Sequence, residues 1–86
     1  MHESTVCREI LMIAQRAAFS NDIACITDIT LAIGEKTCIQ PEQLQFCFSI
    51  AKQGTIAEQA ILHIIHDETI TGDRQEFVRQ IKGEEA

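Results

Sequence analysis

The first three residues of the chain have side chains and main-chain groups that could bind a metal ion. Met1, His2 and Glu3 together offer an amine, an amide nitrogen, an imidazole and a carboxylate. Because histidine is a large second residue, we expect Met1 to be retained and to carry a free α-amine. The three nitrogens can close two fused chelate rings, and a nitrogen-rich site of this kind favours Cu(II) or Ni(II) over zinc. From spacing alone, a solvated chain end without metal remains the alternative.

The other two histidines do not form a second site by spacing. His63 and His66 fall in a run that is typical of a β-strand, three residues apart. Residues three apart on a strand point to opposite faces, so these two imidazoles cannot hold one ion without a bend. We therefore interpret them as strand residues.

The four cysteines do not have the spacing of a zinc site. They contain no Cys-x-x-Cys pair, whereas structural zinc sites normally draw their ligands from closely spaced pairs. Cysteine is often buried, and disulfides are rare in cytosolic chains. We interpret all four as small buried thiols and expect no zinc; they are Cys7, Cys25, Cys38 and Cys47.

The sequence has no arrangement that indicates an enzyme. Cys7 and His2 could be imagined as a nucleophile and its base, but a third group and an oxyanion hole are not apparent. The four glycines form no phosphate-binding loop. We therefore expect a protein that binds rather than catalyses.

Composition and net charge limit the class of protein to which this chain can belong and the kinds of partner that it can bind. Residues 1–86 are short enough for one domain, and 45% of them are hydrophobic, which favours a folded domain over a disordered tail. A net charge of −6 without a basic cluster argues against nucleic acid and anionic membranes. There is no signal-peptide pattern and no apolar run near the ~20 residues that a membrane span needs, so we expect a cytoplasmic protein.

Hydrophobic periodicity predicts five elements in the order α-β-α-β-β. This order predicts an α+β, two-layer domain in which two helices cover a small three-stranded sheet. Gly72 in the short connection 67–75 suggests that the last two strands are hairpin neighbours. The predicted ranges are a helix at 4–19, a strand at 24–34, a helix at 41–53, and strands at 60–66 and 76–82.

Local signals refine the two helices. Ser4 or Thr5 is placed to cap the first helix, and Pro41 suits the first position of the second. Phe46 and Ile50 lie outside the inner stripe of the second helix, which suggests cover from more than one side. The inner stripe itself is predicted to be Leu44, Cys47, Phe48 and Ala51.

Several stretches resemble the HypA/HybF family of nickel metallochaperones. Similar stretches are the start Met1-His2-Glu3, the Leu31-Ala32-Ile33-Gly34 segment, residues 38–62 (CIQPEQLQFCFSIAKQGTIAEQAIL) and the tail EFVRQIKGEE. The block 38–62 is the most specific of these. One departure is large, because the family inserts a zinc domain with paired cysteines where this chain has only the cysteine-free connection 67–75.

The resemblance implies a function and partners. It implies Ni(II) binding at Met1, His2 and Glu3, and maturation of [NiFe] hydrogenase or urease. It also implies contacts with the nickel-handling GTPase of that system and with the hydrogenase large subunit, for which Arg8 and Glu9 are candidates. An open edge on the last strand offers a route to a homodimer. The alternative is an adaptor or regulatory relative that docks to these partners without delivering metal.

Overall fold

A computed structural model describes residues 3–85 and confirms the predicted class and element order. The elements are α1 (Glu3–Ser20), β1 (Ile23–Ile33), α2 (Pro41–Ala51), β2 (Ile61–His66) and β3 (Glu76–Glu85). Their bounds lie within about three residues of the predicted ones, which is usual for helix and strand ends. No helix of the described part is long and apolar enough to cross a membrane.

α1 is an amphipathic helix whose apolar stripe faces the core. The capping role predicted for Ser4 and Thr5 is wrong, because the helix begins at Glu3 and both residues lie inside its first turn. At the other end, the Asn21 side chain donates a 2.7 Å hydrogen bond to the Ala17 carbonyl, and Asp22 turns the chain with a positive φ of 56°. The buried stripe consists of Val6, Cys7, Ile10, Leu11, Ala14 and Ala18.

The strands are arranged in the order β2-β1-β3, which corrects the predicted hairpin. β2 runs parallel to β1, and β3 runs antiparallel to β1 on its other side. Parallel neighbours need a crossover, and α2 supplies it between β1 and β2. The connection 67–75 then carries the chain across to the opposite edge of β1, so the last two strands are never paired with each other.

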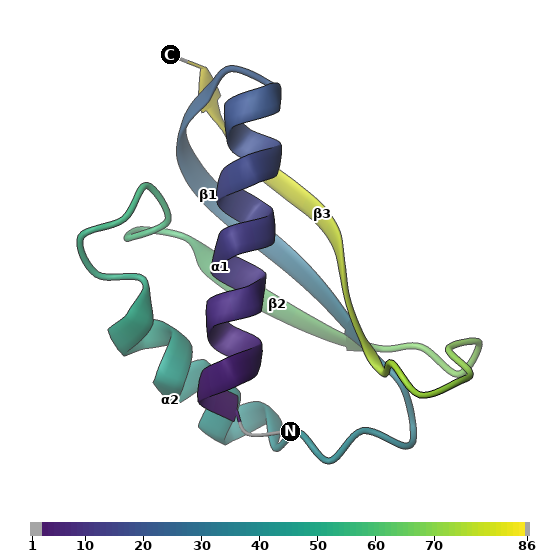
Figure 1. The fold of residues 1–86 in the computed structure, drawn as a ribbon. Helices are drawn as coiled ribbons and strands as arrows, with labels where there is room; N and C mark the ends of the chain where they lie inside the picture. The colour runs from purple at the N-terminus through teal and green to yellow at the C-terminus, as the bar shows by residue number, and fades with distance from the viewer. Residues whose placement is uncertain (1–2, 86) are drawn as a thin grey trace.

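Both helices lie on one face of this sheet (Figure 1). α1 packs along β1 and β3, whereas α2 packs against α1 and β2. The inward residues of the central strand, Ile29, Leu31 and Ile33, are buried beneath them. On the opposite face the side chains of Ile61 and Ile65 are exposed, so the sheet is covered on one side by the described elements.

α2 buries only one stripe, although the sequence suggested cover from several sides. Leu44 and Phe48 are buried in the core as predicted, and Pro41 starts the helix. Phe46 and Ile50, however, are 67% and 56% exposed. The prediction is wrong because α2 lies at the border of the helical layer, where no further described element covers its outer side.

The connection 67–75 is fastened to the end of β1 by hydrogen bonds. The Gly34 amide donates to the Gln75 carbonyl at 2.8 Å, and the Lys36 amide donates to the Gln75 side-chain oxygen at 3.1 Å. The Gln75 side-chain nitrogen donates in turn to the Gly72 carbonyl at 2.9 Å. Gln75 is only 5% exposed, so this side chain closes the connection from inside.

Candidate metal site and its surroundings

The predicted metal site lies at the start of α1, and one of its three residues is described. Met1 and His2 lie outside the described residues, so the predicted ligation stays a prediction. Glu3 opens α1, and its Oε2 accepts a 3.3 Å hydrogen bond from the backbone amide of Gln40. Gln40 is the residue before α2, so this bond joins the starts of the two helices (Figure 1).

Cys7 is the nearest thiol to this site along the chain, and it is packed rather than exposed. Its side chain is 1% exposed, and its Sγ donates to the Leu44 carbonyl at 3.6 Å. Burial raises the pKa of the Cys7 thiol to about 11, with smaller contributions from Cys47 and Glu3. Cys7 is therefore protonated at neutral pH. This agrees with our prediction that Cys7 is a buried thiol in the apolar stripe of the first helix.

The remaining cysteines are less buried than we predicted. Cys25 and Cys47 are partly buried, and Cys38 is exposed. Cys38 lies in the connection between β1 and α2. It lines a hollow of about 360 Å³ together with Glu9 and Arg74, whose side chains form a 3.6 Å ion pair. This hollow could not be predicted from sequence patterns, because its walls come from three segments that lie far apart in the chain.

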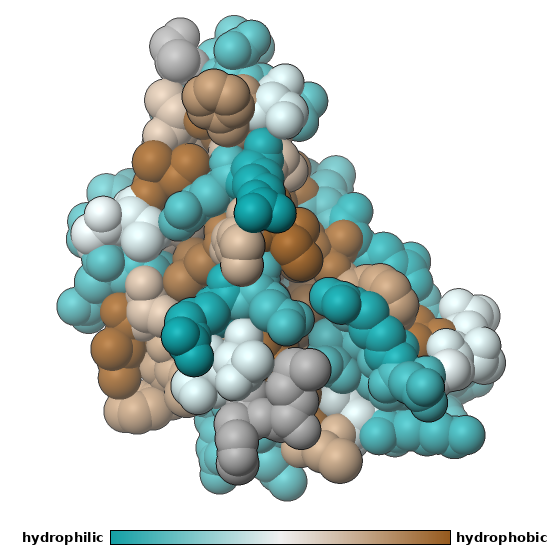
Figure 2. Space-filling model, viewed as in Figure 1, coloured by the Kyte–Doolittle hydropathy of each residue, from teal (hydrophilic) through white to brown (hydrophobic). Residues whose placement is uncertain are grey.

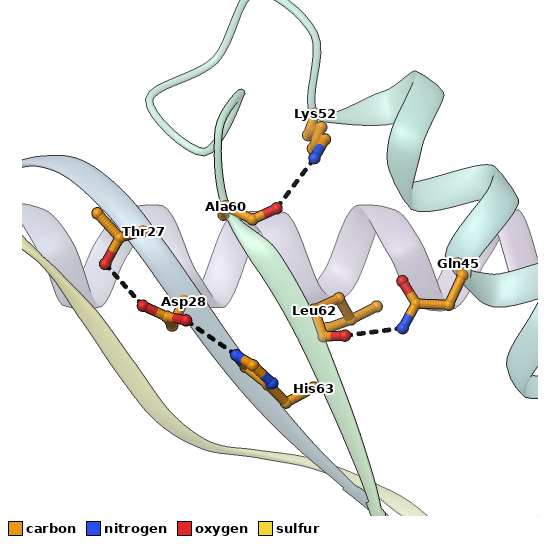
Figure 3. Close-up of polar contacts among 7 residues, drawn as sticks. All are labelled: Thr27, Asp28, Gln45, Lys52, Ala60, Leu62 and His63. Carbon is orange, nitrogen blue, oxygen red and sulfur yellow. Dashed lines mark hydrogen bonds and ion pairs between the residues drawn. The ribbon is translucent and has the colours of Figure 1, made fainter.

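The two strand histidines are separate, as their spacing predicted. His66 ends β2 and is exposed, whereas the His63 Nε2 lies 2.8 Å from Oδ1 of Asp28 on the open face of the sheet (Figure 3). Asp28 also accepts a 2.8 Å hydrogen bond from the Thr27 hydroxyl. The bond to His63 is the main reason that the pKa of Asp28 lies below its ordinary value.

The Asp28–His63 pair was missed by sequence reasoning because it depends on strand register. In the parallel pairing, Thr30 of β1 lies opposite His63, and Asp28 lies opposite Ile61. Asp28 and His63 are thus diagonal neighbours on one face, within reach of each other. The hairpin that we predicted would have given β2 a different neighbour.

Side chains of α2 and of Lys52, the residue that follows it, cover part of β2 and of Ala60, the residue that precedes β2. Gln45 donates to the Leu62 carbonyl at 2.7 Å, and Lys52 donates to the Ala60 carbonyl at 2.9 Å (Figure 3). Each bond satisfies a carbonyl that would otherwise face outward from an edge strand. β3 forms the other edge of the sheet, as the sequence predicted for the last strand.

The helical side of the molecule carries exposed hydrophobic residues. Figure 2 shows hydrophobic surface interleaved with hydrophilic side chains on the face that α1 crosses. Met12 and Phe19 of α1 are 47% and 87% exposed. Phe46 and Ile50 of α2 are exposed as well. Arg8, which the resemblance made a partner-contact candidate, is exposed on the same helix.

Among residues 3–85 no three or more His, Cys, Asp or Glu side chains come together in a way that could hold a metal ion. The described part of the chain therefore contains no internal metal cage.

Comparison with known proteins relates this chain to one family. Residues 1–72 match the family described as "Hydrogenase/urease nickel incorporation, metallochaperone, hypA". The chain is 44% identical over 64 residues to the hydrogenase maturation factor HypA of Archaeoglobus fulgidus, a match that covers 74% of this chain and 58% of that protein. It is 35% identical over 66 residues to the hydrogenase maturation factor HybF of Escherichia coli, covering 77% of this chain and 58% of HybF.

Similarity to a solved structure supports the same fold. The solution structure of the Ni metallochaperone HypA from Helicobacter pylori aligns with a TM-score of 0.86 at 14% identity and covers 100% of both chains. At this identity the likeness concerns the fold alone. The matched region spans 58% of the length of the curated relatives, so what those whole proteins do does not transfer to this chain directly.

Proposed function

Because the chain belongs to the HypA family of hydrogenase and urease nickel-incorporation metallochaperones, we propose that it carries Ni(II) bound through Met1, His2 and Glu3. The α-amine of Met1, the amide and imidazole nitrogens of His2 and the Glu3 carboxylate form the ligand set. The observation that carries the proposal is the family match itself, which begins at residue 1 and includes all three ligands. The chain acts as a carrier and not as an enzyme.

The position of Glu3 supports its role as the carboxylate ligand. Its Oε2 is held by the Gln40 amide, which fixes the side chain at the junction of α1 and α2. A carboxylate has two oxygens, so Oε1 can ligate while Oε2 keeps this hydrogen bond. A ligand held in this way loses less conformational freedom when it binds an ion.

The proposed mechanism is ligand exchange at an open site. Among the described residues no group of three or more His, Cys, Asp or Glu side chains could hold an ion, so we propose a site at the chain start that is open to a receiving protein. The ligands of a receiving protein can then replace those of the carrier one at a time. We propose that the receivers are the nickel-handling GTPase and the large subunit of [NiFe] hydrogenase, or urease, in the cytoplasm.

Calorimetric titration of the untagged protein with Ni(II) tests the site. We expect one ion per chain, and we expect His2→Ala to weaken binding by about tenfold or more, which corresponds to about 1.4 kcal/mol. His63→Ala is the matched control, since it removes another imidazole that lies on the far sheet face beside Asp28. A residue added before Met1 should also weaken binding, because it replaces the amine with an amide.

Equal affinity in His2→Ala and the parent would rule out the proposed site. If instead His63→Ala weakened binding as much as His2→Ala, the ion would not be bound at the chain start alone. Glu3→Gln separates the two roles of that residue, because the amide oxygen can still accept from Gln40 but is a weaker ligand.

The exposed hydrophobic residues of α1 and α2 favour a second candidate, an adaptor that docks without delivering metal. Met12, Phe19, Phe46 and Ile50 are all more than 45% exposed. A pull-down with the purified GTPase discriminates the two functions. Retention by His2→Ala in metal-free buffer supports the adaptor, whereas nickel-dependent retention that His2→Ala abolishes supports the carrier.

We propose that residues 1–86 are one nickel-binding domain without the zinc domain of the family. The cysteine-free connection 67–75 supports this, because Gln75 closes it by hydrogen bonds. Metal analysis of protein purified with zinc present should find no tightly held zinc. Light scattering tests the proposed homodimer, for which the edge of β3 is better suited than the partly covered edge of β2.

A further inference from the structure

Two cysteines meet where α1 packs against α2. Cys7 of α1 and Cys47 of α2 line one apolar groove of about 330 Å³, together with Arg8 and Ile50. The Cys7 Sγ lies 3.6 Å from the carbonyl oxygen of Leu44, which precedes Cys47 by one helical turn. The two thiols therefore approach each other from neighbouring helices.

Their burial differs in a way that matters for reactivity. Cys7 is 1% exposed, whereas Cys47 is only partly buried and is packed at the margin of the core. The effect of Cys47 on the ionisation of Cys7 is a second sign that the two groups are close. The side chains at this contact are small, with Ala51 beside Cys47, so the helices can approach closely.

We propose that Cys7 and Cys47 are an oxidisable dithiol that closes into a disulfide across the α1–α2 contact. A disulfide requires Cα atoms about 4.4–6.8 Å apart. Helices whose axes are about 8–10 Å apart, with Cα atoms about 2.3 Å from each axis, bring facing Cα atoms into or near this range. We therefore expect closure to need only a small shift of one helix against the other.

The oxidant class is a small disulfide such as oxidised glutathione. The Cys47 thiolate attacks one sulfur of the oxidant, and one glutathione leaves as thiolate and takes up a proton. The Cys7 thiol then loses its proton to solvent and attacks the Cys47 sulfur, which releases the second glutathione. In total two S–H bonds are replaced by one S–S bond, and one oxidised glutathione becomes two reduced molecules.

The order of the two steps follows from exposure. Cys47 borders the open groove and reacts first, whereas Cys7 lies beneath it and reacts only with the neighbouring sulfur. Because the thiolate is the attacking form and the pKa of Cys7 is raised to about 11, the second step should quicken by about tenfold per pH unit between pH 7 and 9. The glutathione adduct on Cys47 accumulates at the lower pH.

Closure would tie the two helices together beside the proposed metal site. Glu3 lies one turn before Cys7 on α1 and accepts a hydrogen bond from the residue that precedes α2. A covalent α1–α2 link therefore restrains the junction that holds Glu3. The disulfide itself does not depend on nickel binding, so the two proposals can fail separately.

Peptide mapping of the full chain tests the dithiol. Metal-free protein is incubated with oxidised glutathione at pH 7 and pH 9, quenched with acid and digested without reduction. We expect a cross-linked peptide pair that contains Cys7 and Cys47 and is lighter by two hydrogen atoms. Of these two cysteines, only Cys47 should carry the glutathione adduct, whereas the exposed Cys38 is expected to form an adduct of its own. A Cys25→Ser/Cys38→Ser double variant is the matched control and should close as fast as the parent.

Two variants then separate the steps. Cys7→Ala should stop at the Cys47 adduct, and Cys47→Ala should give neither an adduct at Cys7 nor a cross-link under the same conditions. A cross-link that involves Cys25 or Cys38, or persistence of the Cys47 adduct in the parent at pH 9, would overturn the proposal. The mapping of the parent protein needs no variant, so it decides the matter even if a variant folds poorly.

Discussion

Alanine at Gly34 should destabilise the protein by displacing the side chain that closes the connection 67–75. A Cβ atom at Gly34 would collide with Oε1 of Gln75 and would lie 2.9 Å from its Cδ and 3.0 Å from Cγ2 of Ile70. Gly34 is not among the glycines with positive φ, so its backbone would accept alanine. The penalty is therefore steric and falls on Gln75.

The size of the effect follows from the bonds that Gln75 makes. Its side chain accepts from the Lys36 amide and donates to the Gly72 carbonyl, and each such bond contributes about 0.5–1.5 kcal/mol. The Lys36 amide is partly buried, and leaving it without a partner adds about 1–3 kcal/mol. Gly34→Ala should thus lower the free energy of unfolding by about 2–6 kcal/mol. This loss exceeds the ~0.4–1 kcal/mol that alanine contributes by restricting the unfolded chain.

A double-mutant cycle measured by urea unfolding tests this reasoning. Gln75→Ala alone should cost about as much as Gly34→Ala, because it removes the same two bonds and leaves the Lys36 amide without its partner. Gly34→Ala/Gln75→Ala should be about as stable as Gln75→Ala, since the collision with the Gln75 side chain is gone. The two losses should therefore be non-additive by about the whole Gly34→Ala loss. Additive losses, or a Gly34→Ala cost below about 0.5 kcal/mol, would show that Gln75 does not close the connection as described.

Three further outcomes are expected. Phe48→Ala should lower the free energy of unfolding by about 3–5 kcal/mol in urea titrations, because it opens a cavity in the core. Phe46 is exposed, so Phe46→Ala should change this free energy by less than about 0.5 kcal/mol. Similar losses in the two variants would refute the assigned burial. The bond to His63 lowers the pKa of Asp28 below 3.8, so the stability that the ionised carboxylate contributes is present above pH 3.8 and is lost as pH falls through the lower folded value. In NMR titrations His63→Ala should therefore raise the pKa of Asp28, and an unchanged titration would contradict the pairing. EDTA should leave the melting temperature unchanged, because hydrogen bonds close the connection 67–75; a fall in melting temperature would reveal a structural metal.

Local sequence patterns were sufficient for the elements and their inward faces. The helical stripe that contains Val6 and Ile10, and the alternation of Ile29, Leu31 and Ile33, depend on the fixed periods of helix and strand. The stripe of α2 was also predicted correctly, with Leu44 and Phe48 in the core. These features need no knowledge of distant residues.

Strand neighbours and side-chain partners could not be predicted in this way. Alternation of apolar and polar residues is the same for a parallel and an antiparallel neighbour, so the hairpin between β2 and β3 was a reasonable but wrong choice. The exposure of Phe46 and Cys38 likewise depends on which elements happen to cover them. Side-chain pairs such as Asp28 with His63 follow from register, which is a property of the assembled sheet.

The sequence by itself determined the α+β class, the element order and the residue types at the chain start that suit nickel. These depend on short-range periodicity and on the donor atoms of Met1, His2 and Glu3. The tertiary structure decided that Glu3 meets Gln40, that Cys7 meets Cys47, and that Gln75 seals the connection 67–75. Each of these contacts joins residues more than 35 positions apart, and only packing of the complete chain brings such residues together.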